Sequence, residues 1–165
     1  MEPAAMPKSP TSKHFSPPQS LPAKSSEDPR LTRVSEIALA LPQVTRQVYG
    51  SHAQFLVRKK TFAYFLDNHH GDGIVGVTCK VMSGENKALV AAQPRRFYLP
   101  AYVASRGWVA LRLDVGKIDW SEVRDLLVGS YLLTAPKNLA RIVENQVPNK
   151  LRGAFLPGSR GVTSR

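Results

Sequence analysis

The sequence is poor in cysteine, in acidic side chains and in long apolar runs. One cysteine, Cys79, among 165 residues cannot form an intramolecular disulfide and excludes a metal site built from several thiolates. No apolar run approaches the roughly 18 residues of a transmembrane helix. The N-terminus also lacks the apolar segment of a secretory signal. These absences lead us to expect a cytoplasmic protein that does not bind membranes.

Basic residues clearly outnumber acidic ones. The chain has 23 Lys and Arg against 12 Asp and Glu, which gives a formal net charge of +11. A field of this sign attracts polyanions such as nucleic acid. Between Leu31 and Ala135 there are 13 cations and eight acids, so this part is only moderately basic. Residues 136–165 hold six further cations against Glu144 alone.

Composition divides the chain into three parts. Residues 1–30 hold seven of the 13 prolines, with serines between them and no apolar periodicity. Such a segment buries too little surface to offset its ordering entropy, so it is predicted to be a disordered extension. Residues 31–145 have the pattern of one folded domain. Residues 146–165, rich in glycine, proline and cations, are predicted to be a basic flexible tail.

Within the domain the apolar periodicity alternates between helical and extended. A helix is predicted over 33–41, and a second over 83–92 with Ser83 as its cap. A third begins at Asp119, where Asp119 and Glu122 form a capping box, and a short helix follows Pro136. Strands are predicted at 44–49, 53–58, 61–66, 73–81, 95–100 and 108–113. The order helix, strands, helix, two strands, helix indicates an α+β fold of two layers. In it, helices pack on one face of an antiparallel sheet and the other face stays partly open.

The residues give little support for catalysis, and we expect neither an enzyme nor a cofactor. A nucleophile needs a base within hydrogen-bonding reach and a group that orients that base, and the sequence does not indicate such a set. The densest metal-like cluster is Asp67, His69, His70 and Asp72. Because Asp, Asn and Gly favour turns, this segment is interpreted as a solvated loop. Cys79, in an apolar strand, is interpreted as a buried small side chain.

Five stretches together resemble the MmcQ/YjbR family. They are LALPQVT, FLVRKKTFA, VTCKV, RGWVALRLD and DWSEVRDLLVGSYLLTAPKNLA, and the match as a whole runs from about Leu31 to Ala140. The resemblance implies a small α+β protein, similar in shape to frataxin-like and secretion-chaperone-like folds. Many members of the family are labelled DNA-binding. The iron chemistry of frataxin is not expected, because the first helix has no ridge of acidic residues.

The resemblance also marks individual positions. A lysine common in the family falls on Lys60, and the lysine that closes the next long strand falls on Lys80. Its aromatic position after the middle helix falls on Phe97, and its GWV falls on residues 107–109. The family often has glycine where this chain has Arg58 or Lys59. The two cations add charge to the turn, and the absence of glycine argues against a tight glycine turn.

Taken together, these observations predict a nucleic-acid-binding protein, with DNA favoured over RNA, that contacts phosphates and has weak sequence specificity. The predicted contact residues are Arg58, Lys59, Lys60, Lys80, Arg95 and Arg96. Phe62, Tyr64, Phe97 and Tyr98 would lie near them and offer rings for stacking on bases. Cations at turns also keep proteins soluble and protect edge strands, which explains the same residues without a ligand. The alternative is a non-enzymatic module that binds a protein or a small ligand on the open sheet face. We expect a monomer.

Overall fold

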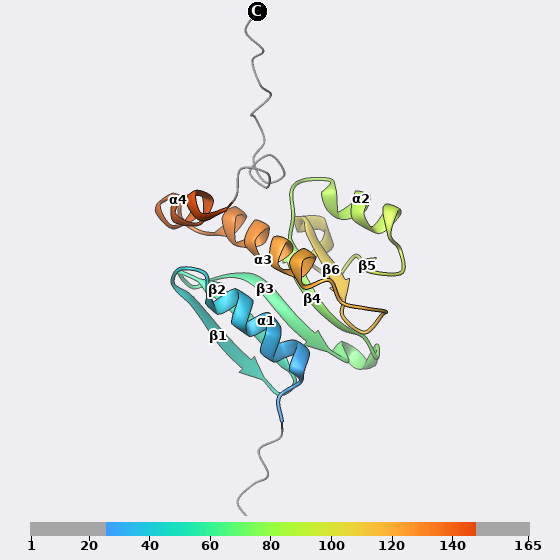
Figure 1. Ribbon diagram of the computed structural model, residues 1–165. Helices are drawn as coiled ribbons and strands as arrows, with labels where there is room; N and C mark the ends of the chain where they lie inside the picture. The colour runs from blue at the N-terminus through green and yellow to red at the C-terminus, as the bar shows by residue number, and fades with distance from the viewer. Residues whose placement is uncertain (1–25, 148–165) are drawn as a thin grey trace, which may run out of the picture.

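The computed structural model describes residues 26–147, which form one sheet and four helices (Figure 1). The predicted N-terminal extension and most of the predicted basic tail lie outside the described residues. The helices are α1 (Pro29–Leu39), α2 (Glu85–Ala92), α3 (Trp120–Thr134) and α4 (Lys137–Gln146). The strands are β1 (Val44–Tyr49), β2 (His52–Val57), β3 (Lys60–Asp67), β4 (Val75–Lys80), β5 (Phe97–Tyr98) and β6 (Trp108–Arg112). Two short 3-10 helices, η1 (His69–Gly71) and η2 (Ala104–Arg106), lie in the connections.

The six strands form one sheet in the order β1-β2-β3-β4-β6-β5, with antiparallel pairing throughout. The first four strands follow one another as a meander, as the short turns between them predict. β6 then pairs directly with β4, and β5 lies outside it at the edge. The predicted α+β fold is therefore confirmed, with one difference of detail. The strand predicted at 95–100 is reduced to Phe97 and Tyr98.

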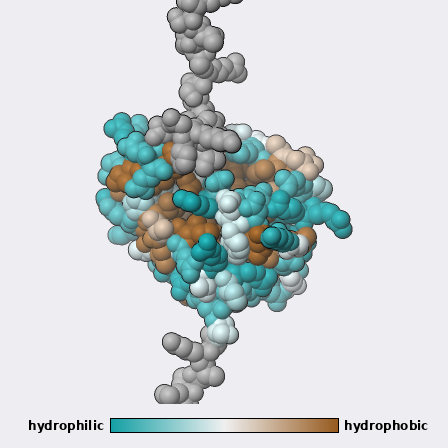
Figure 2. Space-filling view, viewed as in Figure 1, coloured by the Kyte–Doolittle hydropathy of each residue, from teal (hydrophilic) through white to brown (hydrophobic). Residues whose placement is uncertain are grey.

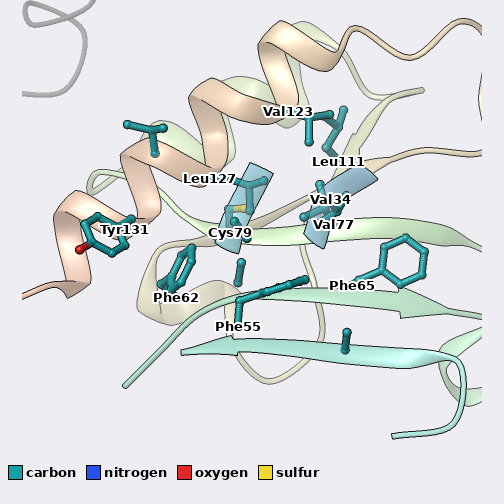
Figure 3. Close-up of a cluster of buried hydrophobic side chains, with 14 of the residues drawn as sticks. Val34, Phe55, Phe62, Phe65, Val77, Cys79, Leu111, Val123, Leu127 and Tyr131 are labelled. Atoms are coloured by element: carbon teal, nitrogen blue, oxygen red, sulfur yellow. The ribbon is translucent and has the colours of Figure 1, made fainter. Parts of the chain in front are cut away.

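Helices α1 and α3 cover one face of the sheet. Val123, Leu127 and Tyr131 of α3 point from the helix toward the strands and are fully buried (Figure 3). Opposite them, Phe62 of β3 meets the Tyr131 ring edge-on, with the ring centroids 5.6 Å apart. Cys79 lies in the same layer and is fully buried, as predicted. Each such buried side chain removes enough apolar surface from water to contribute about 1.5–3 kcal/mol.

The helix starts follow local capping chemistry. Asp28 caps α1, which begins at Pro29, before the predicted domain start at Leu31. The Asp119 carboxylate accepts the backbone N–H groups of Ser121 and Glu122, which confirms it as the cap of α3. The Glu122 carboxylate does not complete a capping box, because it contacts the Arg96 guanidinium instead.

The start of α2 differs from the prediction. Gly84, at φ 83°, occupies the cap position and Ser83 does not. Instead of a cap from Ser83, the Glu85 carboxylate accepts the backbone N–H of Met82 at 3.1 Å. The reversal at Gly84 uses a left-handed backbone that glycine adopts without strain.

Hydrophobic side chains reach the surface of the helix-covered side in separate patches between hydrophilic ones (Figure 2). This mixture is usual for a surface in contact with water. Among residues 26–147, no helix is both long and apolar enough to cross a bilayer.

Candidate nucleic-acid interface

Arg58 and Lys59 form a two-residue turn between β2 and β3, and Lys60 begins β3. Both turn residues have positive φ, 48° for Arg58 and 66° for Lys59. Positive φ at both central positions is what a type I′ hairpin turn requires, since its twist matches that of the strands. The turn is therefore tight although neither position is glycine. All three side chains are exposed, and we call residues 58–60 the basic hairpin.

The cations of the basic hairpin are available for a ligand. The Arg58 Nε donates to the Gln43 side-chain oxygen at 2.6 Å, which orients the guanidinium without neutralising it. Within the described part of the chain, no acidic side chain forms an ion pair with Arg58, Lys59 or Lys60. Three unneutralised charges at consecutive positions give a concentrated positive potential at this end of the sheet.

Lys80 lies at the same end of the sheet as the basic hairpin but on the other face. Lys60 pairs with Val57, a core residue on the helix-covered side, whereas Lys80 pairs with Trp108 on the open side. Directly paired residues place their side chains on the same face of a sheet. Lys60 and Lys80 therefore flank the sheet end from opposite faces.

Arg95 and Arg96 lie at the opposite end of the sheet. The backbone N–H of Arg112, at the far end of β6, donates to the Arg96 carbonyl at 2.8 Å. Because β6 separates β5 from β4, β5 runs parallel to β4, and its start lies beside the start of β4 rather than beside Lys80. The six predicted contact residues therefore do not form one continuous surface.

Arg96 is also largely occupied within the fold. Its guanidinium contacts the Glu122 carboxylate, donates to the Gln93 side chain at 2.6 Å and lies 5.8 Å from the centre of the Phe97 ring. These contacts fix the connection after α2 against α3. Arg95, in contrast, is exposed.

Acidic side chains gather at the end opposite the basic hairpin. Asp67 closes β3 there, and Asp28, at the start of α1, lies with it around one shallow depression. The pKa of Arg30 is raised, mainly by its hydrogen bond to Asp28 and in addition by Asp67 and Asp114, so these carboxylates lie close to one guanidinium. Arginines lie among these carboxylates: Arg30 pairs with Asp28 and Arg112 pairs with Asp114.

Burial removes two of the four rings from the predicted stacking surface. Phe62 is 0% exposed and Phe97 is 1% exposed, so both belong to the core and cannot stack on a base. Their places on the helix-covered face explain this correction. Tyr64 and Tyr98 are half-buried on the open face, where the Tyr64 ring lies 5.6 Å from the Trp108 ring.

The loop interpreted as solvated contains η1 with His69 and His70, and the His52 ring of β2 lies beside it. The rings of His69 and His70 lie 3.9 Å apart, and those of His52 and His69 lie 5.3 Å apart. His52 accepts the backbone N–H of Asp67 at Nδ1, which fixes its ring. In residues 26–147 no group of three or more His, Cys, Asp or Glu side chains could hold a metal ion.

The sequence interpretation missed a hollow on the open face around Thr78. The hollow is lined by Tyr64, Tyr98 and Tyr102, among others. The small residues Thr78 and Ala110 stand in neighbouring strands between two tyrosines. The alternation of side chains along each strand can be followed in the sequence. Which residues of different strands become neighbours depends on the strand order.

These features define a class of protein, a small α+β domain with a half-covered antiparallel sheet and a basic hairpin at one end. The YjbR family model matches residues 39–133, more than half of the chain, and the protein belongs to the YjbR family. Protein DR2400 of Deinococcus radiodurans, whose crystal structure has the family domain DUF419, has a similar fold. Its TM-score is 0.52 at 20% sequence identity, and the match covers 82% of this chain and 94% of that one. No curated protein matches this chain.

Proposed function

We propose that this protein binds nucleic acid, with duplex DNA as the first ligand to test. The observation that carries the proposal is the group of exposed cations in the basic hairpin that form no ion pair. The three exposed cations of the basic hairpin are free of acidic partners among the described residues, whereas Arg30, Arg96 and Arg112 at the opposite end each pair with a carboxylate. Cations of this kind neutralise phosphates and release condensed counterions, which favours binding without reading the base sequence.

Other cations lie at the same end of the sheet as the basic hairpin. Lys80 reaches this end from the open face. The end of α3 also lies there, because the Tyr131 hydroxyl bonds the carbonyl of Pro42, just before β1, at 2.8 Å. Helix α4 follows directly after α3 and therefore begins at the same end. Figure 1 shows α4 on the same side as the turn between β2 and β3. The exposed Lys137 at the start of α4 therefore adds charge to this end. Glu85 lines the same pocket as Lys80, and its carboxylate, which accepts the Met82 N–H, keeps its charge and offsets part of the charge of Lys80.

Burial of Phe62 and Phe97 favours a contact with phosphates over stacking on bases. Base-edge recognition would require polar side chains that enter a groove, and the basic hairpin offers only long cations. The proposed binding is therefore phosphate-directed and of low sequence specificity. The backbone of the basic hairpin also supports the proposal. Arg58 and Lys59 have positive φ, which glycine adopts with less strain, yet both positions hold cations.

The test is the salt dependence of DNA binding by the full chain. The logarithm of the affinity should fall with the logarithm of salt concentration by about 0.9 for each phosphate neutralised. The variant R58A/K59A/K60A should bind more weakly and reduce this slope by about one unit for each phosphate that it no longer neutralises. The matched control K87A/R95A/K117A removes the same charge from exposed positions outside the basic hairpin.

Two results would contradict the proposal. One is the absence of binding even at low salt. The other is an equal loss of affinity in both triple variants, because this would make the binding a property of net charge rather than of the basic hairpin.

A further inference from the structure

A pocket of about 440 Å³ lies on the open face of the sheet, away from the basic hairpin. Tyr64 and Leu66 of β3 form one wall, and Tyr98 with residues 100–103 forms the other. The turn that contains His69, His70 and Asp72 closes one end. Nothing in the proposed nucleic-acid contact uses this pocket.

The pocket follows from the size of the side chains in one row across the sheet. Strand pairing places Gln54, Tyr64, Thr78, Ala110 and Tyr98 side by side on the open face. Neighbouring strands are about 4.8 Å apart, so the two tyrosines stand about 14 Å from each other. The two residues between them are small, which leaves a hollow wide enough for a ring system.

The floor of the pocket carries an unused hydrogen-bonding group. Thr78 is 2% exposed, and its hydroxyl has no hydrogen-bond partner. It is the one buried side-chain polar atom without a partner within residues 26–147. Native structures rarely leave such a group unpaired. Thr78 lines the pocket between its cross-strand neighbours Tyr64 and Ala110, so a ligand in the pocket can supply the missing partner.

The pocket lining favours a ligand without negative charge. It includes the Asp72 carboxylate and neither lysine nor arginine. The pKa of Tyr98 is raised, first by burial and then by Asp72 and Asp114, while Arg112 acts in the opposite direction. The pKa of His69, which lines the pocket beside His70, is lowered, mainly by desolvation, and this disfavours the cationic form of its imidazole. Phosphates and carboxylates are therefore disfavoured here.

Aromatic surface dominates the remaining contacts. Tyr64 is supported from behind by Trp108, and Tyr98 is half-buried. Tyr102 is 88% exposed and has a φ of 68°, a conformation that non-glycine residues seldom adopt. A tyrosine held in this way at the pocket mouth offers a ring face to a planar ligand.

We propose that this pocket binds a planar aromatic or heteroaromatic small molecule that carries no negative charge. A hydrogen-bond acceptor of the ligand accepts from the Thr78 hydroxyl, and its ring packs between the tyrosine walls. This site is separate from the basic hairpin, so binding of such a molecule does not require nucleic acid.

Three probes of the same shape test the proposal by titration of the full chain, followed by amide NMR. They are isoquinolin-1-one, which has a carbonyl acceptor, naphthalene, which has none, and 1-naphthoate, which is an anion. Isoquinolin-1-one should bind most tightly and shift the amides of residues 76–78 and 98–103. Naphthalene should bind more weakly, and 1-naphthoate should bind least.

The variant T78V removes the hydroxyl and keeps the shape. It should lower the affinity for isoquinolin-1-one about 5–10-fold and leave the affinity for naphthalene unchanged. It should also raise Tm by about 2–8 °C, because an unpaired buried hydroxyl is lost. The variant Y102A, at an exposed position, should weaken both neutral probes without unfolding the protein. Y49A, which removes an exposed tyrosine on β1, is the matched control and should change nothing.

Three outcomes would overturn the proposal. They are no binding of any probe at millimolar concentration, equal binding of 1-naphthoate and isoquinolin-1-one, and T78V binding isoquinolin-1-one as the wild type does.

Discussion

Lys80 donates its backbone N–H to the hydroxyl of Ser130 at 2.8 Å, although 50 positions separate the two residues. The same hydroxyl donates to the Phe62 carbonyl. The ladder between β3 and β4 ends at the pair Ala63 and Cys79, so Phe62 and Lys80 would be the next partners. The Ser130 hydroxyl of α3 thus bridges β3 and β4 at the end of their ladder, in place of one strand-to-strand hydrogen bond.

Replacing Ser130 by alanine should lower the free energy of unfolding by about 2–4 kcal/mol, because a buried carbonyl and a buried N–H lose their partner together. Urea denaturation measures this difference. The control is Thr134→Ala, which removes a hydroxyl bonded only to the Ser130 carbonyl one turn earlier. Its cost should stay below about 1.5 kcal/mol. Equal costs for the two variants would show that the bridge to the strands has no special weight.

Lys59→Gly should raise the free energy of unfolding by about 1 kcal/mol, because glycine adopts the positive φ at this position without strain. The same change should weaken DNA binding and reduce the salt slope by about one unit, since a cation is removed. Thermal denaturation and salt titration measure the two effects. Gly50→Ala is the reverse control. At φ 60°, with no atom near the added methyl group, it should destabilise the protein through the backbone alone.

Cys79 should resist alkylation in the folded protein. Its side chain is fully buried, and burial raises the pKa of the thiol well above its ordinary value, so very little nucleophilic thiolate is exposed. Iodoacetamide followed by intact-mass measurement should show no adduct in native buffer and one adduct in urea. Rapid labelling in native buffer would mean that the core opens often near β4.

His69 should titrate below the ordinary histidine range. Desolvation lowers its pKa most, and the neighbouring His70 and His52 lower it further. Since the unfolded chain binds this proton more readily, the contribution of His69 to stability should fall as pH drops through the ordinary pKa toward the lowered one. NMR titration of the imidazole signals measures the shift. His70→Gln should move the pKa of His69 upward, and an unchanged value would contradict this assignment.

The elements could be predicted from the sequence because their causes are local. The Asp119 cap and the spacing of Val123, Leu127 and Tyr131 are sufficient to place α3. The family match agrees with the resemblance drawn from the quoted stretches. The face of the sheet on which each cation lies could not be predicted in the same way. A bulge between Phe55 and Leu56 breaks the simple alternation, so counting residues does not give the side of the sheet on which Lys60 lies.

The sequence also could not place Arg95 and Arg96. If β5 had paired with β4, these cations would lie beside Lys80, as the predicted surface requires. The observed order puts β6 between them and moves Arg95 and Arg96 to the other end. The hollow at Thr78 depends on the same strand order. Long-range pairing therefore decided both the candidate interface and the pocket.

The bridge at Ser130 also constrains when the chain can fold during synthesis. The Ser130 hydroxyl bonds a carbonyl 68 positions earlier in the chain, and the Tyr131 hydroxyl bonds one 89 positions earlier. All strands leave the ribosome before α3 does. Until α3 emerges, the buried faces of β3 and β4 stay uncovered and one gap in their ladder stays open. Such long-range contacts slow folding and leave apolar strands exposed. A nascent chain that stalls before α3 should therefore depend on chaperones, whereas the finished domain should not.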